Sequence, residues 1–577
     1  MLEDHLNKSF SLPIDFCSNT YDTPKNLFED LELIQTHKDV SNVTLYEHLL
    51  NPQTPFGYLT LEKWSEKYTT NAAFLKDTQK MLSNNKPIDK INIIEKAWKS
   101  YKGIKEDEGF IDNYQYINWK PLQFLNTSIV FLTIISIYSI LSPLLNLLAP
   151  ILLLIVPFLI MKLKGLTITF QNYGILLVAS LKRHSFGKLL TGWSTIPTGQ
   201  KMYLMVMLGM YVYNIYQNGI SCYQFYKNTT TINNDIKNIK NFLKHTREKV
   251  GQHIVKIDKL ETYKPYQEYL QKKLEDIDNL FISLNKVPLA SFNPGKIPYI
   301  GYTMKEYYKL YEDEKIQDTI LFSFGFQGYL DNIGEISNKI RNKKINKMKY
   351  LKRSKAVLKL KEAQYPVMQQ QLSESKNIPN DIDLKTNKLI TGPNASGKTS
   401  LLKTTITNIL LSQQFGFGFF KKGCMTPFDH LHCYLNIPDT SSRDSLFQAE
   451  ARRCLEILTK IKDNEDKKHF CIFDELFSGT NPYEAISSAK SYLAHLSKSK
   501  NIKFLLTTHF ITLCKQLDDN SQISNVNMKT SIKNEIPIYY YKLQNGISEI
   551  KGGITVLKQL GYPQNIIDET NKAMDNF

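Results

Sequence analysis

Leu389-Ile-Thr-Gly-Pro-Asn-Ala-Ser-Gly-Lys-Thr399 is the stretch that decides the fold of the C-terminal part of this chain. Its two leading apolar residues predict a short strand, and the Gly-x-x-x-x-Gly-Lys-Thr pattern that follows predicts a phosphate-binding loop. Gly392 and Gly397 allow the backbone to turn so that successive N–H groups face phosphate oxygens. The apolar residues of 401–411 predict the helix whose N-terminus such a loop requires. This part of the chain is therefore expected to be an α/β P-loop domain.

The residues of the loop are assigned to a nucleotide by their chemistry. Lys398 is expected to reach the β- and γ-phosphates, and the Thr399 hydroxyl is expected to ligate Mg²⁺. The predicted nucleotide contacts are Gly392, Pro393, Asn394, Ala395, Ser396, Gly397, Lys398, Thr399 and Ser400. The cofactors expected at this loop are therefore ATP and Mg²⁺.

Two further apolar runs end in residues that suit phosphoryl chemistry. His469–Phe473 is followed by Asp474 and Glu475. Asp474, at a strand end, is expected to hold Mg²⁺, and Glu475 to orient or deprotonate the attacking water. A third strand, Leu505–Thr508, ends in His509. A lone histidine is usually structural, but in this order it is similar to a histidine that senses the γ-phosphate.

Composition limits the class of protein. With 577 residues the chain is too long for one core, and about two to four domains are expected. A hydrophobic share of 42% excludes wholesale disorder. The net charge of +17 comes almost wholly from lysine, and it permits binding to nucleic acid or to an anionic membrane without choosing between them.

The cysteines and the N-terminus indicate the compartment. Seven scattered cysteines without a C-x-x-C pair are typical of free thiols in a reducing compartment. His430, His432 and Cys433 form a candidate metal corner, but without a second pair of ligands a polar loop is the preferred interpretation. Residues 1–15 are mixed and charged, so no signal peptide is expected.

An uncharged block, Pro121–Met161, is the strongest signal outside the nucleotide motifs. It has 41 residues, of which 25 are Leu, Ile, Val or Phe. One bilayer crossing takes about 20 apolar residues. With Ser142-Pro143 as a turn, the block predicts two transmembrane helices, roughly 122–141 and 144–161, and the lysines that flank it predict cytoplasmic ends. The alternative is a buried helical pair in a soluble core.

The rest of the central region gives weaker signals. Met202–Tyr213 is expected to be a packed or interfacial helix, and the apolar spacing of 228–284 predicts long packed helices. Glycines, prolines and aromatic residues in 291–330 predict a compact, partly extended segment. Lys339–Lys361 carries eleven Lys or Arg in 23 positions. It is either one solvated helix face or a surface for phosphates of lipid or nucleic acid.

A family resemblance rests on the order and spacing of the nucleotide motifs. Thr391–Lys398, then Asp474-Glu475-x-x-x-Gly479-Thr480, then Thr507-Thr508-His509 resemble the MutS family of ABC-type ATPases. The sequence has no LSGGQ signature; Ser445-x-Phe447-x-x-Glu450 is instead similar to the Ser-x-Phe-x-x-Glu segment of MutS proteins. In that family the serine reaches the γ-phosphate of the opposite subunit. The resemblance therefore implies a homodimer in which Ser445 acts in trans, beside the alternative of a helix N-cap.

The resemblance extends toward both ends of the chain. The segments that carry it are Asp30–Leu33 and Thr44–Gly57 (opening of the MutS lever domain), Tyr365–Val367 and Asn380–Ile382 (strands leading into the ATPase), and Tyr541–Gly546, Gly552-Gly553 and Gly561–Pro563 (the C-terminal helix-turn-helix). Because the lever-like segment begins near residue 30, neither a mismatch-reading domain nor a connector domain is expected before it.

Two features distinguish this chain from the mismatch repair members of the family that it resembles. Asn377 and Ile378 stand where family members place the aromatic residue that stacks on adenine, which puts the adenine contacts in doubt. The Asp474–Pro482 segment resembles a membrane-associated subgroup of MutS-like ATPases.

These observations predict a multidomain chain whose parts follow one another in order. They are an N-terminal tail (1–30), a mainly α-helical lever-like region (31–120), a transmembrane helical hairpin (121–161), lever- or clamp-like helices (162–364), and an α/β P-loop, ABC-like ATPase domain with a C-terminal helix-turn-helix (365–577).

The leading hypothesis is a membrane-anchored ATPase, with its ATPase domain on the cytoplasmic side, whose nucleotide cycle opens and closes a dimer. The alternative is a DNA-binding repair or remodelling protein without a mismatch-reading domain. A transporter is disfavoured because the hairpin has no charged intramembrane residue.

Overall fold

The computed structural model describes most of the chain and divides it into two units. The described residues are 2–36, 43–83, 85–165, 167, 169–183, 187, 197–288, 299–366, 377–435, 446–533, 536–548, 550, 557 and 560–575. Unit 1 comprises Met1–Asp89, Lys249–Lys273 and Leu321–Phe577, and unit 2 comprises Lys90–Glu248 and Leu274–Ile320. Residues of both units occur in the helices α12 (Thr198–Ile257), α13 (Lys264–Asn285) and α15 (Glu314–Arg341).

A six-stranded sheet in unit 1 contains the nucleotide motifs. Its order is β13-β12-β6-β11-β10-β9, with bounds Asn387–Thr391 (β6), His430–Tyr434 (β9), His469–Asp474 (β10), Ile502–Thr507 (β11), Ile523–Lys533 (β12) and Ile536–Asn545 (β13). All strands are parallel except β13, which runs antiparallel to β12. β10 and β11 are almost entirely buried, as expected of central parallel strands covered on both faces. The strands predicted before the phosphate loop, before Asp474 and before His509 are confirmed.

Helices pack on this sheet and complete an α/β layer. They are α17 (Lys398–Phe415), α18 (Leu446–Lys462), α19 (Pro482–Ser497), α20 (Ile511–Gln516) and α22 (Gln564–Asp575). The apolar core between strands and helices includes Phe473, Leu493 and Phe504. Asn481 caps α19 by accepting a hydrogen bond from the Glu484 amide at 3.0 Å. The helix predicted after Gly561–Pro563 is present as α22, whereas residues 551–556, before it, lie outside the described residues.

A second sheet in unit 1 has the order β5-β4-β8-β3-β7. Its strands are β3 (Asn346–Tyr350), β4 (Leu358–Ala363), β5 (Asn380–Asp383), β7 (Phe417–Gly418) and β8 (Lys422–Met425). The basic segment Lys339–Lys361 is therefore not one helix face: α15 ends at Arg341, and strands β3 and β4 follow. Its lysines alternate with buried residues such as Met348 and Leu360, which is the two-residue period of a half-buried strand.

The N-terminal part of unit 1 is mainly helical. Its elements are α1 (Leu2–Ser9), η1 (Pro13–Phe16), β1 (Thr20–Asp22), α2 (Lys25–Asp30), α3 (Leu45–Leu50), α4 (Pro55–Leu59), α5 (Leu61–Glu66), β2 (Lys67–Thr69), α6 (Ala72–Leu82) and, from a later part of the chain, η4 (Glu261–Tyr263). Thr44 begins α3 with a capping box: its hydroxyl accepts from the Glu47 amide, and the Glu47 carboxylate accepts from the Thr44 amide. Phe10 packs against Phe322, Phe326 and Tyr329 of α15.

Unit 2 is built from helices. They are α7 (Ile91–Lys105), α8 (Phe110–Asn113), η2 (Lys120–Thr127), α9 (Ile129–Leu163), α10 (Phe170–Arg183) and α14 (Ile300–Glu312), with the unit 2 residues of α12, α13 and α15. The partly extended structure predicted for 291–330 is wrong from residue 300 onward, where α14 and α15 are helical. Phe322, Phe324 and Phe326 are all fully buried there, because a helix that is apolar on most sides lies inside the core.

The predicted turn at Ser142-Pro143 is also wrong. α9 continues through it as one helix of 35 residues. Proline inside a helix removes one backbone hydrogen bond and crowds the preceding turn, which can kink a helix without ending it. The apolar run on both sides of Pro143 continues as one helix. Among the described residues, one segment, Ile129–Leu148, is long and apolar enough to cross a membrane, and Leu154–Leu163 is a shorter apolar stretch.

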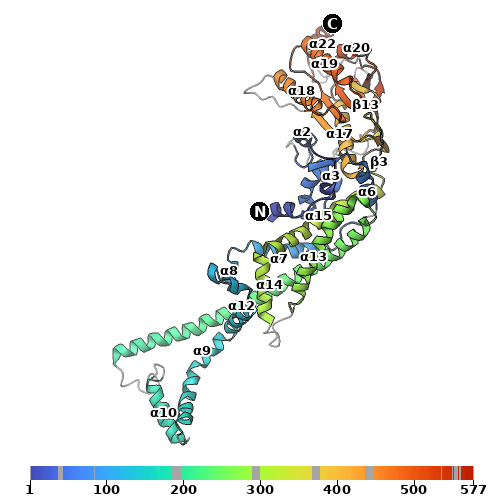
Figure 1. The fold of residues 1–577 in the computed structure, drawn as a ribbon. Coiled ribbons are helices and arrows are strands. Elements are labelled where there is room, and N and C mark those ends of the chain that lie inside the picture. Colours follow the sequence, from blue (N-terminus) through green and yellow to red (C-terminus); the bar gives the residue numbers. More distant parts are fainter. Residues whose placement is uncertain are drawn as a thin grey trace. The chain divides into compact units, whose positions relative to one another are not determined.

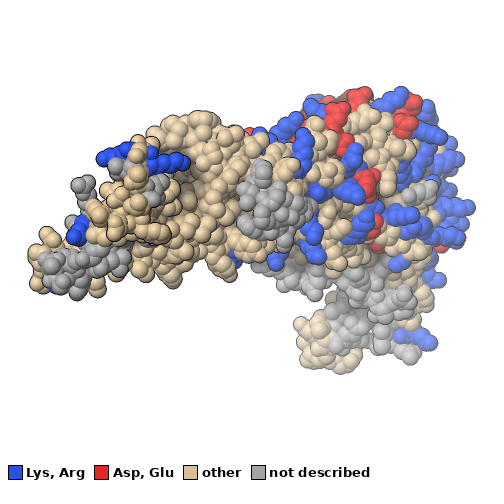
Figure 2. All heavy atoms as spheres, turned by 90° about the horizontal axis from the view of Figure 1, so that it is seen from below, with Lys and Arg blue, Asp and Glu red and all other residues tan. Residues whose placement is uncertain are grey.

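Besides α14 and α10, α9 contacts the first half of α12. The Asn146 amide donates to Asn214 Oδ1 at 3.0 Å, and the Cys222 thiol lies 3.7 Å from the Ile140 carbonyl oxygen, so the two helices are antiparallel there. Beyond this contact they diverge, and α10 lies beside the end of α9 (Figure 1). The surface of α9, α10 and the first half of α12 has few charged side chains (Figure 2). The predicted packed helix Met202–Tyr213 is the exposed start of α12.

Candidate functional site

The phosphate loop connects β6 to α17 and has the backbone that its sequence predicts. Gly392, Ala395 and Gly397 have φ values of 154°, 62° and 92°. A side chain at Gly392 would lie 2.8 Å from Ser396 Oγ, and one at Gly397 would lie 3.2 Å from the Tyr541 ring. Both glycines are therefore required by conformation and by space.

Lys398 is held inside this loop. Its ammonium donates to the carbonyl oxygens of Gly392 at 3.0 Å and Pro393 at 3.3 Å, and lies 3.1 Å from His509 Nε2. Burial lowers the pKa of Lys398, and the nearby carboxylates of Glu475 and Asp474 oppose that shift. Lys398 is thus a partly desolvated cation, and phosphate oxygens could replace the two carbonyl oxygens that now accept its hydrogen bonds.

Asp474 lies directly beside the loop, as predicted. Its Oδ2 accepts a hydrogen bond from the Thr399 hydroxyl at 2.8 Å, and its Oδ1 accepts from the Thr507 hydroxyl. The parallel pairing of β10 and β11 places Asp474 opposite Thr507, which explains the second contact. The two residues predicted to hold Mg²⁺ are therefore adjacent.

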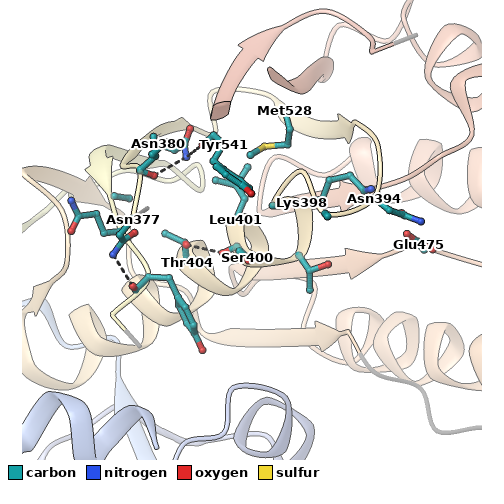
Figure 3. Close-up of a pocket in the computed structure, with 17 residues that line it drawn as sticks. Asn377, Asn380, Asn394, Lys398, Ser400, Leu401, Thr404, Glu475, Met528 and Tyr541 are labelled. Atoms are coloured by element: carbon teal, nitrogen blue, oxygen red, sulfur yellow. Dashed lines mark hydrogen bonds between the residues drawn. The ribbon is translucent and has the colours of Figure 1, made fainter. Parts of the chain in front are cut away.

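Glu475 and His509 form a pair at the same edge of the sheet. His509 Nε2 lies 2.9 Å from Glu475 Oε1. The hydrogen bond from His509 lowers the pKa of Glu475, although burial acts in the opposite direction. Glu475 has a left-handed backbone with φ of 52°, and its amide donates to the Thr507 carbonyl at 3.0 Å. Glu475 lines the cavity near Asn394 and Lys398 (Figure 3), and its carboxylate contacts His509.

The arrangement fits a nucleotide with a divalent cation. Thr399 and Asp474 supply the hard oxygen ligands that Mg²⁺ prefers. The Ser396 hydroxyl is buried and, among the described residues, has no hydrogen-bond partner, which suits a loop that cradles an anion. A cavity of about 420 Å³ extends from Asn394 and Lys398 along α17.

The far wall of this cavity contains residues that were not predicted to contact the nucleotide. They are Tyr365, Asn377, Ile378, Met528 and Tyr541. Asn377, Met528 and Tyr541 are labelled in Figure 3. Asn377 and Ile378, which stand where family members place an aromatic residue, do lie at the site, and aromatic residues reach it instead from Tyr365 and Tyr541. The pairing of β12 with β13 returns the chain past Gly397 and brings Tyr541 there. Local sequence does not show such a long-range approach.

Asn380 fixes this wall. Its amide group donates to the Tyr541 carbonyl at 2.8 Å, and its Oδ1 accepts from the Leu543 amide at 2.7 Å. Asn377 donates to the Tyr365 carbonyl at 3.2 Å. The Asn380 bonds join β5 to β13, and the Asn377 bond joins the residues before β5 to those after β4, so the two sheets contribute to one pocket.

Ser445 lies outside the described residues, and α18 begins at the next position. The following motif residue, Glu450, is buried. Its carboxylate accepts from the Ser478 amide and hydroxyl and from the Gly479 amide, each at 3.1 Å. A side chain at Gly479 would lie 2.7 Å from Leu446 Cγ. The start of α18 therefore packs against the loop that follows Glu475.

The polar loop predicted at His430, His432 and Cys433 is wrong. His430 and His432 lie on strand β9, and His432 Nε2 is 3.1 Å from Nδ1 of His469 on β10. Burial lowers the pKa of His430 to about 4 and that of His432 well below its usual value. In the described part of the chain, no group of three or more His, Cys, Asp or Glu residues could hold a metal ion.

Comparison with known proteins gives the same assignment as the motifs. The family model for MutS domain V matches residues 388–577. The DNA mismatch repair protein MutS of Cytophaga hutchinsonii is 29% identical over 230 residues, which cover 38% of this chain and 26% of that protein. The MutS protein of Phocaeicola vulgatus is 30% identical over 226 residues, with the same coverage. The chain thus spans about a quarter of the length of the curated relatives it matches. The chain therefore contains a domain V of the MutS family, in residues 388–577.

Proposed function

We propose that the chain is a membrane-anchored ATPase whose nucleotide cycle opens and closes a homodimer. The observation that carries the ATPase assignment is the meeting of Lys398, Thr399, Asp474, Glu475 and His509 at one sheet edge. Bound Mg²⁺, held by Thr399 and Asp474, would neutralise phosphate charge. Lys398 exchanges its two carbonyl acceptors for phosphate oxygens, and Glu475 orients a water molecule or takes its proton.

Glu475→Gln tests this chemistry. The amide keeps the shape of the side chain but cannot accept the proton, so ATP binding is expected to persist while hydrolysis falls by a factor of about 10² to 10⁴. Glu465→Gln, at an exposed position in the turn after α18, is the matched control and should keep full activity. Undiminished turnover in Glu475→Gln would remove Glu475 from this role.

The dimer is proposed on the family relation and on the position of α18. Glu450 and Gly479 hold the start of this helix beside the loop that follows Glu475, so the position after Ser445 is fixed close to the nucleotide motifs. If Ser445 acts in trans, a mixture of Ser445→Ala and Lys398→Ala proteins contains one composite site with both defects and one with neither. Such a mixture should recover part of the turnover that each variant lacks, and no recovery would contradict action in trans.

The membrane anchor is proposed on the uncharged surface of α9 and α12. Large apolar side chains are exposed along α9 on several faces, among them Val130, Leu145 and Leu147. Residues 202–226, which start α12, contain no Asp, Glu, Lys or Arg. Exposed apolar surface of this kind marks contact with lipid or with another protein. We assign it to lipid because α9 carries a 20-residue apolar segment, Ile129–Leu148, which suits one bilayer crossing.

Alkaline extraction of membranes tests the anchor. The protein is expected to remain in the membrane pellet, and recovery in the aqueous fraction would overturn the assignment. Replacement of Ile134 and Leu141, two exposed residues near the middle of Ile129–Leu148, by Lys adds about 2.5 to 3.5 kcal/mol per charge at the centre of a span and should release the protein. Tyr58→Lys, which places a charge at an exposed position of unit 1, is the control.

Binding of a nucleic acid backbone is a second candidate function, and the second sheet favours it. Lys361 on β4 pairs directly with Lys422 on β8, and the pairing of Met348 with Gly423 places Lys347 on the other side of Lys422. All three lysines are exposed. Because like charges opposite each other destabilise a sheet, this row suits a polyanion.

Salt dependence tests the second candidate. If Lys347, Lys361 and Lys422 contact duplex phosphates, replacing all three by Gln should reduce the slope of log K against log salt by about 0.9 for each contact. A control that replaces Lys63, Lys96 and Lys498 changes the net charge equally. An unchanged slope in the first variant would exclude this face as the binding surface.

A further inference from the structure

A second cavity in unit 1, of about 250 Å³, lies between α12, α15 and the segment 85–89. It shares no residue with the nucleotide cavity. Lys249, His253 and Lys256 line it from α12, because residues four and three apart lie on one helix face. The segment 85–89 closes the other side by crossing α15 at Gly334, where an added Cβ would lie 2.9 Å from the Lys86 carbonyl oxygen.

The walls of this cavity carry an excess of positive charge. Three lysines, Lys86, Lys249 and Lys256, face one carboxylate, Asp89, which gives a formal charge of +2. Lys249 pairs with Asp89 at 2.8 Å. The Lys256 ammonium donates instead to the uncharged Asn85 Oδ1 at 2.5 Å, and among the described residues neither Lys256 nor Lys86 pairs with a carboxylate. Burial lowers the pKa of Lys256 to about 8. A buried cation is normally paired with an anion, and Lys256 has only the uncharged Asn85.

His253 adds an independent observation. It is 4% exposed and packs edge-on against the rings of Tyr266, Phe326 and Tyr329. Its Nε2 is buried and has no hydrogen-bond partner among the described residues. Buried polar atoms are nearly always satisfied by protein, water or ligand. α12 thus supplies both Lys256, which has no carboxylate partner among the described residues, and His253 Nε2, which has no hydrogen-bond partner among them.

We propose that this cavity is a binding site for a small phosphate-bearing anion, either the free ion or a small phosphate ester. Lys256 and Lys86 supply charged donors and Gln252 supplies an amide group, and phosphate oxygens accept from donors of both kinds. Asn85 holds Lys256 at the cavity, while its own amide group donates to the Met81 carbonyl oxygen at 3.1 Å. At about 250 Å³ the cavity is much smaller than the nucleotide cavity of about 420 Å³, so a compact anion fits it better than a nucleotide. The site binds independently of the ATPase cycle proposed above.

Titration calorimetry on the full-length protein tests the site. All variants carry Lys398→Ala, which removes the main phosphate contact of the nucleotide loop, and the probes are inorganic phosphate and, separately, glycerol 3-phosphate. We expect saturable binding of at least one probe. Lys256→Met keeps the apolar stem but removes one charged hydrogen bond, and should weaken binding by about ten-fold or more. Lys259→Met, at an exposed position that does not line the cavity, should bind like its parent.

A second variant separates loss of the site from loss of the fold. Lys86 is exposed outside its contact with the cavity, so Lys86→Met should fold normally and also bind more weakly. Binding of inorganic phosphate alone assigns the site to the free ion, and binding of glycerol 3-phosphate assigns it to a phosphate ester. Absence of saturable binding for both probes would overturn the proposal. So would equal affinity in the Lys256→Met, Lys86→Met and Lys259→Met proteins.

Discussion

Glu450→Gln is the substitution that most sharply tests how the loop after Glu475 is held. Glu450 is 3% exposed, and its two carboxylate oxygens accept three hydrogen bonds from Ser478 and Gly479. An amide keeps one accepting oxygen and turns an NH₂ group toward a backbone N–H. At least one hydrogen bond to a charged acceptor is lost, which costs about 1.5 to 3 kcal/mol locally. The loop between Glu475 and α19 should then shift.

The expected kinetic result follows from the position of this loop. Glu450 does not line the nucleotide cavity, so the Kd for ATP should change little. A displacement of about 1 Å at a catalytic group reduces turnover by roughly 10²-fold, and kcat should therefore fall while binding persists. Steady-state hydrolysis and fluorescent-nucleotide titration measure the two quantities. Glu456→Gln, exposed on the same helix, is the control. A Glu450→Gln protein with the kcat of the control would refute the idea that this carboxylate positions the loop.

Three other predictions concern the nucleotide cavity and the histidines. Tyr541→Ala should weaken ATP binding by roughly 5- to 100-fold because one aromatic stacking contact contributes about 1 to 3 kcal/mol, whereas Tyr541→Phe should bind normally; equal affinity in both would exclude stacking. Thr399→Val should raise the Mg²⁺ concentration needed for half-maximal turnover, measured by Mg²⁺ titration at saturating ATP, and an unchanged requirement would remove the hydroxyl from the metal site. The pKa of His430 is about 4 in the folded chain, below its usual value of about 6.5. Its contribution to stability is therefore complete above pH 6.5 and is lost as the pH falls toward 4, so the thermal midpoint should drop over that range, and less steeply in His430→Gln.

The sequence was sufficient for the parts of the site that are local in the chain. The spacing of Gly392, Gly397 and Lys398 specifies the loop, and the apolar strands before Asp474 and His509 specify where their side chains emerge. Parallel pairing then brings these strand ends to one edge. Every one of these contacts follows from short-range pattern and from the rule that parallel strands end together.

The features that the sequence did not predict depend on contacts between distant segments. Tyr541 reaches the phosphate loop only because β13 folds back on β12, and Tyr365 reaches the cavity only through the second sheet. The solvated helix face predicted for Lys339–Lys361 is wrong, because composition alone does not distinguish a basic helix from basic strands such as β3 and β4. At Pro143 a local turn preference competed with a long apolar run, and the run determined the structure.

α17 provides the physical connection between the nucleotide loop and the N-terminal part of unit 1. It begins at Lys398, and 15 of its 18 residues are buried. At its other end, Gln414 accepts from the Tyr46 hydroxyl at 2.5 Å and donates to the carbonyl oxygens of Trp64 at 2.8 Å and Lys67 at 3.0 Å. A buried polar network of this kind is costly to leave partly satisfied, since each unmade bond costs about 1 to 3 kcal/mol. A movement of α17 that follows a change at Lys398 must therefore carry these N-terminal helices with it. The lever-like segment and the ATPase motifs belong to one mechanical unit for this reason, although more than 300 residues separate Trp64 from Lys398 in the sequence.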